Sequence, residues 1–143
     1  MSSFSDKFNE LIEDKNTDIE KISKFLGLNN NTKVYAWLKG TNTPRFKTIV
    51  LLADYFTCSL DYLLGKTENF KTIKPKALPE FNVHFKKVLK ECKCSQYKLL
   101  KDNIVSKGHL NSWFNKKIVP STENIIKLAD YLNVSIDYLV GRE

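Results

Sequence analysis

The chain has 143 residues, and its 23 Lys or Arg against 16 Asp or Glu give a formal net charge of +7. A basic excess of this kind indicates an anionic partner such as nucleic acid. The N-terminal residues lack the apolar core of a signal peptide, and no apolar run approaches the roughly 18 residues of a membrane span. We therefore expect a cytoplasmic protein without a membrane segment.

The basic residues are unevenly distributed along the chain. Residues 1–70 carry nine Lys or Arg and nine Asp or Glu, whereas residues 71–143 carry fourteen and seven. The whole net charge therefore lies in the second half, where attraction to an anionic partner is expected to be strongest.

One segment of the chain occurs twice. Residues 53–65 read ADYFTCSLDYLLG, and residues 129–141, which lie 76 positions further on, read ADYLNVSIDYLVG. Over the 17 positions that end at the two final glycines, ten residues are identical. Such self-similarity indicates two copies of one structural unit. We predict a first domain over residues 1–66, a connector over 67–79 and a second domain over 80–143.

In the first copy, apolar spacing and capping residues predict five short helices and no strand. The first helix is expected to begin at an N-cap Ser5, and the second to follow the N-cap Asp18 and to end at Gly27. Gly40 is expected to end the third helix, and Ser59 to cap the fifth. The side chains expected to point inward are Phe8, Leu11, Ile12, Ile22, Phe25, Leu26, Val34, Trp37, Leu38, Ile49, Leu52, Ala53 and Phe56.

The connector contains Pro75 and Pro79, which disfavour helix. Its apolar residues Phe70, Ile73 and Leu78 predict that part of it packs against a domain instead of moving freely. The connector is then expected to limit the relative positions of the two copies.

The second copy repeats the plan of the first. Leu110 and Trp113 define the inward face of its third helix, at the spacing of one helical face. Before Trp113 the offset between the copies is 77 instead of 76, so the first copy has one extra residue, which we place in its turn 29–31. The expected N-caps of the last four helices are Ser95, Ser106, Ser121 and Ser135.

Residues 95–141 of the second copy, SQYKLLKDNIVSKGHLNSWFNKKIVPSTENIIKLADYLNVSIDYLVG, resemble the Cro and lambda-repressor-like (XRE-type) helix-turn-helix family. The resemblance is carried by the Ser-Gln that opens the second helix, by Ser106 before the third, and by Pro120-Ser121 before the fourth. The first copy is similar to the family but less regular. Together the copies resemble two tandem five-helix lambda-repressor-like DNA-binding domains, which implies an all-α fold.

In this family the second helix braces the third, which enters the major groove of DNA. Helical spacing from Leu110 and Trp113 places four residues outward: Gly108, Asn111, Ser112 and Asn115. The resemblance implies that the base readers are Lys107, Gly108, His109 and Ser112. It also implies a phosphate or base-supporting contact from Gln96 and phosphate contacts from Asn115, Lys116 and Lys117. The DNA-binding residues expected in the second copy are Gln96, Lys107, Gly108, His109, Asn111, Ser112, Asn115, Lys116 and Lys117.

The first copy departs from this pattern at two positions. Ile19 stands where the second copy has Gln96, and Ala36 cannot donate or accept a hydrogen bond through its side chain. Residues 29–47 nevertheless carry four basic residues and no acid. The copy either contacts DNA or serves mainly as a packing or partner surface. Its expected DNA-binding residues are Asn31, Thr32, Lys33, Tyr35, Lys39 and Arg45.

The sequence gives little support for a catalytic site or a metal site. His84 and His109 are the only histidines, and three cysteines are too few for a disulfide framework or a four-ligand zinc site. Cys58 and Cys94 stand at apolar positions of the pattern, which favours core cysteines. We expect no enzymatic activity, no cofactor, no bound metal and no small-molecule ligand.

The sequence therefore predicts a sequence-specific regulator of transcription that binds double-stranded DNA, and most simply a repressor. The alternative is a protein-interaction module, such as an antitoxin, in which DNA binding is secondary. The last helix of each copy is expected to expose Tyr62 and Tyr138, which suggests a homodimer or an intramolecular pseudo-dimer through these helices. The Lys-, Asn- and Ile-rich composition suggests a bacterial or phage origin.

Overall fold

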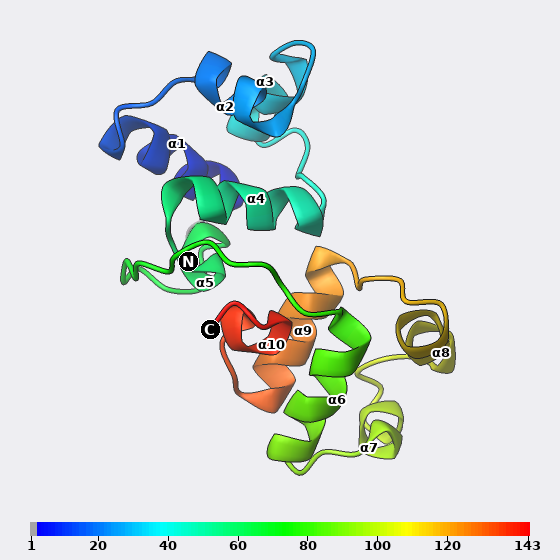
Figure 1. Cartoon of the computed structure of the whole chain (residues 1–143). Helices are drawn as coiled ribbons and strands as arrows, with labels where there is room; N and C mark the ends of the chain where they lie inside the picture. The colour runs from blue at the N-terminus through cyan, green and yellow to red at the C-terminus, as the bar shows by residue number, and fades with distance from the viewer. Residues whose placement is uncertain (1–2) are drawn as a thin grey trace. The chain divides into compact units, whose positions relative to one another are not determined.

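The computed structural model describes residues 3–143, which form ten α-helices and one isolated β-bridge. The chain separates into two compact units, Met1–Pro75 and Lys76–Glu143, with five helices in each (Figure 1). The predicted all-α fold is thereby confirmed.

The first unit has an aromatic core built by helical spacing. Phe8 is fully buried, and its ring centroid lies 6.3 Å from that of Trp37 and 6.2 Å from that of Phe56. These rings join helices far apart in sequence, because α1 packs on α3 and α5. The helices are α1 (Phe4–Asp14), α2 (Ile19–Leu26), α3 (Thr32–Lys39), α4 (Phe46–Phe56) and α5 (Leu60–Leu63).

Most of the predicted helix ends in this unit are confirmed. The side chains of Asp18 and Ser59 accept N-terminal hydrogen bonds of α2 and α5, and Gly27 and Gly40 end α2 and α3 in the left-handed conformation. The prediction of Ser5 as the first cap was wrong. The N-cap is Ser3, which forms a capping box with Asp6 and lets the helix begin two residues earlier than Ser5 would allow.

Phe25 was also predicted wrongly as a core residue. Its side chain is 49% exposed, because Ile22 already fills the inward position of α2 and is fully buried. The Phe25 ring instead packs on Tyr55, with 4.9 Å between the ring centroids. The first unit therefore presents an aromatic side chain at the C-terminal end of α2.

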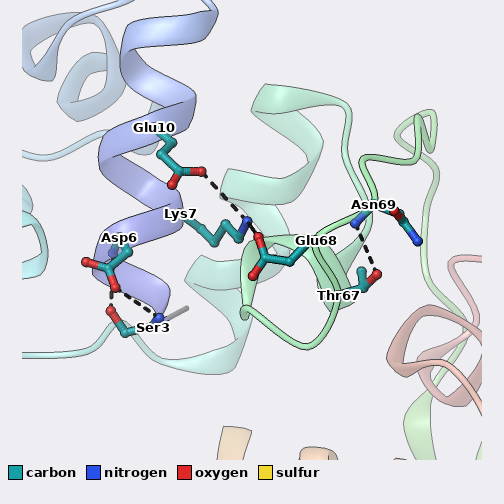
Figure 2. Close-up of polar contacts among 7 residues, drawn as sticks. All are labelled: Ser3, Asp6, Lys7, Glu10, Thr67, Glu68 and Asn69. Atoms are coloured by element: carbon teal, nitrogen blue, oxygen red, sulfur yellow. Dashed lines mark hydrogen bonds and ion pairs between the residues drawn. The ribbon is translucent and has the colours of Figure 1, made fainter. Parts of the chain in front are cut away.

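Part of the connector that follows α5 packs against the first unit, as its apolar residues Phe70 and Ile73 led us to predict. Ile73 is buried, and the Phe70 ring meets the edge of Tyr62 at a centroid distance of 5.2 Å. The expectation that Tyr62 is exposed was wrong: it is 8% exposed, covered by Phe70 and by the ammonium of Lys7, which lies 4.5 Å from the ring centroid. Lys7 also donates to Glu68 at 2.5 Å (Figure 2).

The second unit builds its core from the corresponding positions. Phe85 is fully buried and stacks on Phe114, and α10 packs on both α6 and α9. Ser95, Ser106, Ser121 and Ser135 all cap helices through their side chains, as predicted. The helices are α6 (Phe81–Glu91), α7 (Gln96–Lys101), α8 (Lys107–Asn115), α9 (Thr122–Leu132) and α10 (Ile136–Val140).

The end of the second unit contains a buried ion pair. The guanidinium of Arg142 donates to the carboxylate of Asp137 at 2.6 Å, and both side chains are almost completely buried. Tyr138, on the same helix, is half-buried, so it is less exposed than predicted. A buried charge is tolerated where it is paired and hydrogen-bonded, so this contact fixes the last residues against α10.

Candidate nucleic-acid interface

The start of α8 is held by a reciprocal pair of hydrogen bonds. The Ser106 hydroxyl accepts from the His109 backbone N–H at 3.1 Å, and the Ser106 backbone N–H donates to Nδ1 of His109 at 3.2 Å. This satisfies two backbone donors that would otherwise lack partners at the helix end. Since Nδ1 accepts, the proton of the neutral His109 ring resides on Nε2.

The apolar face of α8 points into the unit, as the sequence predicted. Leu110 is 7% exposed and Trp113 is 2% exposed. The Trp113 ring meets Phe81 and Phe85 with centroid distances of 6.3 and 6.1 Å, and the His109 ring lies parallel over it at 5.4 Å. These contacts fix the rotation of α8 about its own axis, and therefore which residues face solvent.

The opposite face of α8 is polar. Gly108, Asn111 and Asn115 are exposed, and Ser112 is half-buried. A Cβ on Gly108 would meet only the Ser106 hydroxyl at 3.7 Å, so packing within the unit does not require glycine there. The missing side chain instead leaves the backbone open to close approach by a partner. Asn115 donates to Oδ1 of Asn111 at 2.6 Å, which links the last turn of this face to the one before.

α7 precedes α8 in the chain and begins with the predicted Gln96, which is exposed directly after the Ser95 cap. Asp102, at the end of α7, accepts a hydrogen bond from the Tyr131 hydroxyl of α9 at 2.5 Å. This bond raises the pKa of Tyr131 to about 12. The turn between α7 and α8 is thus tied to the body of the unit.

Tyr97 is a residue that the sequence reasoning missed. Its side chain is 64% exposed beside Gln96 at the start of α7, the most exposed of the large apolar and aromatic side chains that the structure describes. Its hydroxyl can donate to phosphate, and its ring can cover apolar surface. A signal was present, because a helix with Leu99 inward has no core position for Tyr97.

The segment after α8 is basic and partly apolar. Lys116 ends the helix, Lys117 takes a left-handed conformation with φ 54°, and Ile118 and Val119 are 51% and 54% exposed. The Lys117 ammonium lies 3.8 Å from Glu80, but both side chains are highly exposed and such a pair is weak. Residues 103–122 contain no acid. Negative charge is therefore absent from the sequence of α8 and its flanks.

In the first unit, the helix that corresponds to α8 is α3, and its exposed residues differ from those of α8. Lys33, Tyr35 and Lys39 are exposed on α3, while Val34 and Trp37 are buried. Thr32 is also exposed, and Asn31, at the N-cap, makes no side-chain capping bond. The predicted Arg45 is exposed at the N-cap of α4.

The start of α2 differs more sharply from that of α7. Ile19 is half-buried where Gln96 is exposed, and the exposed Glu20 stands where the second unit has Tyr97. An acidic side chain repels phosphate, so this end of α2 is poorly suited to a DNA backbone.

Within residues 3–143, no three His, Cys, Asp or Glu side chains gather as they would around a metal ion. No helix in this part of the chain is long and apolar enough to cross a bilayer. Cys58 is completely buried as predicted, whereas Cys94 is only half-buried beside the α7 cap. Partial burial raises the pKa of the Cys94 thiol.

A family model described as helix-turn-helix matches residues 85–139. The match runs from α6 into α10 and covers most of the second unit and none of the first. No curated protein and no solved structure matches the chain. Residues 85–139 of the second unit are therefore similar to the helix-turn-helix family.

Proposed function

We propose that this protein is a sequence-specific regulator of transcription that reads the major groove of double-stranded DNA with α8 of its second unit. The observation that carries the proposal is the division of α8 into two faces. Leu110 and Trp113 anchor one face in the core, while the other is polar, exposed and free of acids. A capped, rotationally fixed helix of this kind suits a groove wide enough to admit it.

The proposed contacts divide into two kinds. Lys107, Gly108, His109, Asn111 and Ser112 face base edges or the adjacent backbone. Gln96, together with Lys116 and Lys117, contacts phosphates on either side, which fixes the register of the helix in the groove. Asn115 supports the base-facing group through its bond to Asn111.

Repression is the simplest mode of action for this regulator. A protein that occupies its operator excludes other proteins from the same DNA. In this proposal the first unit adds a weaker, mainly electrostatic contact through Lys33, Lys39 and Arg45, which are all exposed. The negative charge of Glu20 at the start of α2 repels phosphate, so this contact is weaker than the one made by the second unit.

A second candidate function concerns the first unit alone. Phe25 and Tyr35 are 49% and 50% exposed on α2 and α3, the two helices that correspond to α7 and α8. Exposed aromatic rings are typical of protein-interaction surfaces. A partner bound there, as in an antitoxin, would leave the second unit free to hold DNA.

The test is a binding titration of the full chain on DNA from upstream of its own gene, with unrelated DNA in excess, across a series of salt concentrations. We expect tight binding that survives the competitor. The slope of log affinity against log salt falls by about 0.9 for each phosphate neutralised, so it gives the number of phosphates engaged. Binding that the competitor abolishes would contradict the proposal and favour the protein-interaction function.

A further inference from the structure

Two asparagines on the exposed face of α8 form one hydrogen-bonded unit. Asn111 and Asn115 are four residues apart, so successive helical turns place them one above the other. The side-chain nitrogen of Asn115 lies 2.6 Å from the side-chain oxygen of Asn111. Both residues are exposed, and Leu110 and Trp113 hold this face away from the core.

The bond determines what the pair offers to a ligand. Each amide has one carbonyl, which accepts, and one NH₂ group, which donates. The bond between them uses the carbonyl of one and the NH₂ of the other. The NH₂ group of one residue and the carbonyl of the other then remain for other partners. The same holds if both side-chain amides are rotated so that their oxygen and nitrogen atoms exchange places. The pair therefore offers one unused donor group and one unused acceptor group in either orientation.

We infer that Asn111 and Asn115 together select adenine in the operator, an inference that rests on α8 being the DNA-reading helix. In the major groove adenine offers the acceptor N7 beside the donor N6 amino group. This is the complement of the free groups on the asparagine pair. The joined amides are also ordered before DNA arrives, so binding them costs less side-chain entropy than ordering two separate asparagines.

The other bases fit this pair less well. Guanine presents two acceptors, N7 and O6, so the free carbonyl would face an oxygen. Cytosine presents only a donor, and thymine presents one acceptor beside a methyl group. Each of these would leave a polar atom of the pair without a partner at the interface, which is the basis of strong discrimination.

The first unit lacks the pair. Tyr35 and Lys39 stand at the matching positions of α3, and both are exposed. Tyr35 offers a hydroxyl and Lys39 an ammonium in place of two amides, so the first unit does not repeat the amide pair. The adenine preference is thus assigned to the second unit. Val83→Ala supplies a control, because Val83 is exposed on α6, outside the proposed DNA contacts.

The experiment is selection of binding sites from a randomised duplex library with the full chain. Wild type is compared with Asn111→Ala, Asn115→Ala, the double variant and Val83→Ala. We expect the wild type to select a defined motif. At one position of that motif, the preference of the protein for adenine over the other bases should fall by about 5- to 150-fold in both single variants. Since the pair acts as one unit, the double variant should lose little more than either single variant. Val83→Ala should keep that adenine.

Base analogues at the same position give the second readout. Replacing adenine by 7-deazaadenine removes N7, and replacing it by unsubstituted purine removes the N6 amino group. Each analogue should weaken wild-type binding several-fold and leave the double variant unaffected. Circular dichroism should show an unchanged fold, because both asparagines are exposed and alanine favours helix.

The outcomes separate this inference from the proposed function. A wild-type library without a motif would overturn both. A clear motif whose adenines are unchanged in both single variants, or in which the affected base is guanine, cytosine or thymine, would overturn the asparagine pair alone. Additive losses in the double variant would also overturn it, because two independent asparagines would then be acting.

Discussion

The two units share a plan but differ at the start of the third helix of each, α3 and α8. In the second unit Ser106 and His109 cap each other, and α8 runs for nine residues. In the first unit Asn31 makes no side-chain cap, and α3 runs for eight residues. The buried tryptophan, the serine that caps the last helix and the last two helices recur in both units. The repeated residues thus hold the fold, while the exposed residues that are not repeated distinguish the two surfaces.

The largest expected effect comes from removing the buried tryptophan of either unit. Trp113→Ala should cost about 3 to 5 kcal/mol in the second unit, because a large buried ring leaves a cavity. Trp37→Ala should do the same in the first. Urea denaturation followed by circular dichroism measures the loss of stability. The tryptophan that each variant keeps reports by its fluorescence whether the other unit is unaffected.

The matched control for this pair is Tyr97→Ala, since that side chain is 64% exposed. It should leave the free energy of unfolding nearly unchanged. A Trp113→Ala protein with the full helical signal and an unshifted denaturation midpoint would show that the inward face of α8 has been assigned wrongly.

The next largest effect compares the two units in how much each contributes to specific DNA binding. Replacing Lys107 and Ser112 together by Ala should weaken specific binding by about 1 to 3 kcal/mol for each good base interaction that the change removes. A double change on the exposed face of α3, Lys33 and Lys39 to Ala, should reduce affinity less and mainly flatten its salt dependence. Fluorescence anisotropy on one labelled duplex measures both.

Equal losses of affinity from the two double variants would remove the distinction between the units. A greater loss from the α3 variant would transfer the reading role to the first unit. Circular dichroism of each variant checks that an altered fold is not the cause.

A smaller effect tests the difference in capping. Ser106→Ala removes the acceptor for the His109 N–H, and such a loss costs about 0.5 to 2 kcal/mol. Asn31→Ala should cost much less, because the Thr32 N–H is accepted by Asn30 at 3.0 Å instead. Urea denaturation of the two variants measures the contrast, and equal destabilisation would contradict it.

The smallest effect concerns the ion pair between Lys7 and Glu68 in the first unit. The bond from Lys7 to Glu68 raises the lysine pKa above 10.5. The stabilisation should therefore be complete below pH 10.5 and lost as the pH rises through the higher folded pKa. Glu68→Gln should lower the denaturation midpoint at about pH 8, and its difference from wild type should vanish at high pH. A difference that persists there would exclude the ionised pair as its source.

The sequence predicted the fold well because its signals were local. Capping by Asp18, Ser59 and Ser106, and the inward direction of Trp113, each depend on residues within one or two helical turns. Ser5 failed because Ser3 and Asp6 compete for the same helix start with a reciprocal pair of bonds. Two serines two residues apart both satisfy the capping pattern, and only the geometry decides between them.

Features that depend on distant segments were harder to predict. Tyr62 looked exposed because its cover comes from Lys7, 55 positions earlier, and from Phe70 after the helix. The bond between Asn111 and Asn115 is local, yet the outward face suggested only two separate polar residues. Side-chain pairing within a surface depends on rotamers, which residue spacing does not specify.

The central claim is that α8 of the second unit lies against DNA bases. The most direct test is the ¹H–¹⁵N NMR spectrum of the full chain with and without its selected duplex. We predict that the largest shifts occur at the backbone amides of residues 107–112 and at the side-chain amides of Asn111 and Asn115, with smaller shifts over residues 32–39. Large shifts confined to residues 32–39, with α8 unchanged, would contradict the claim.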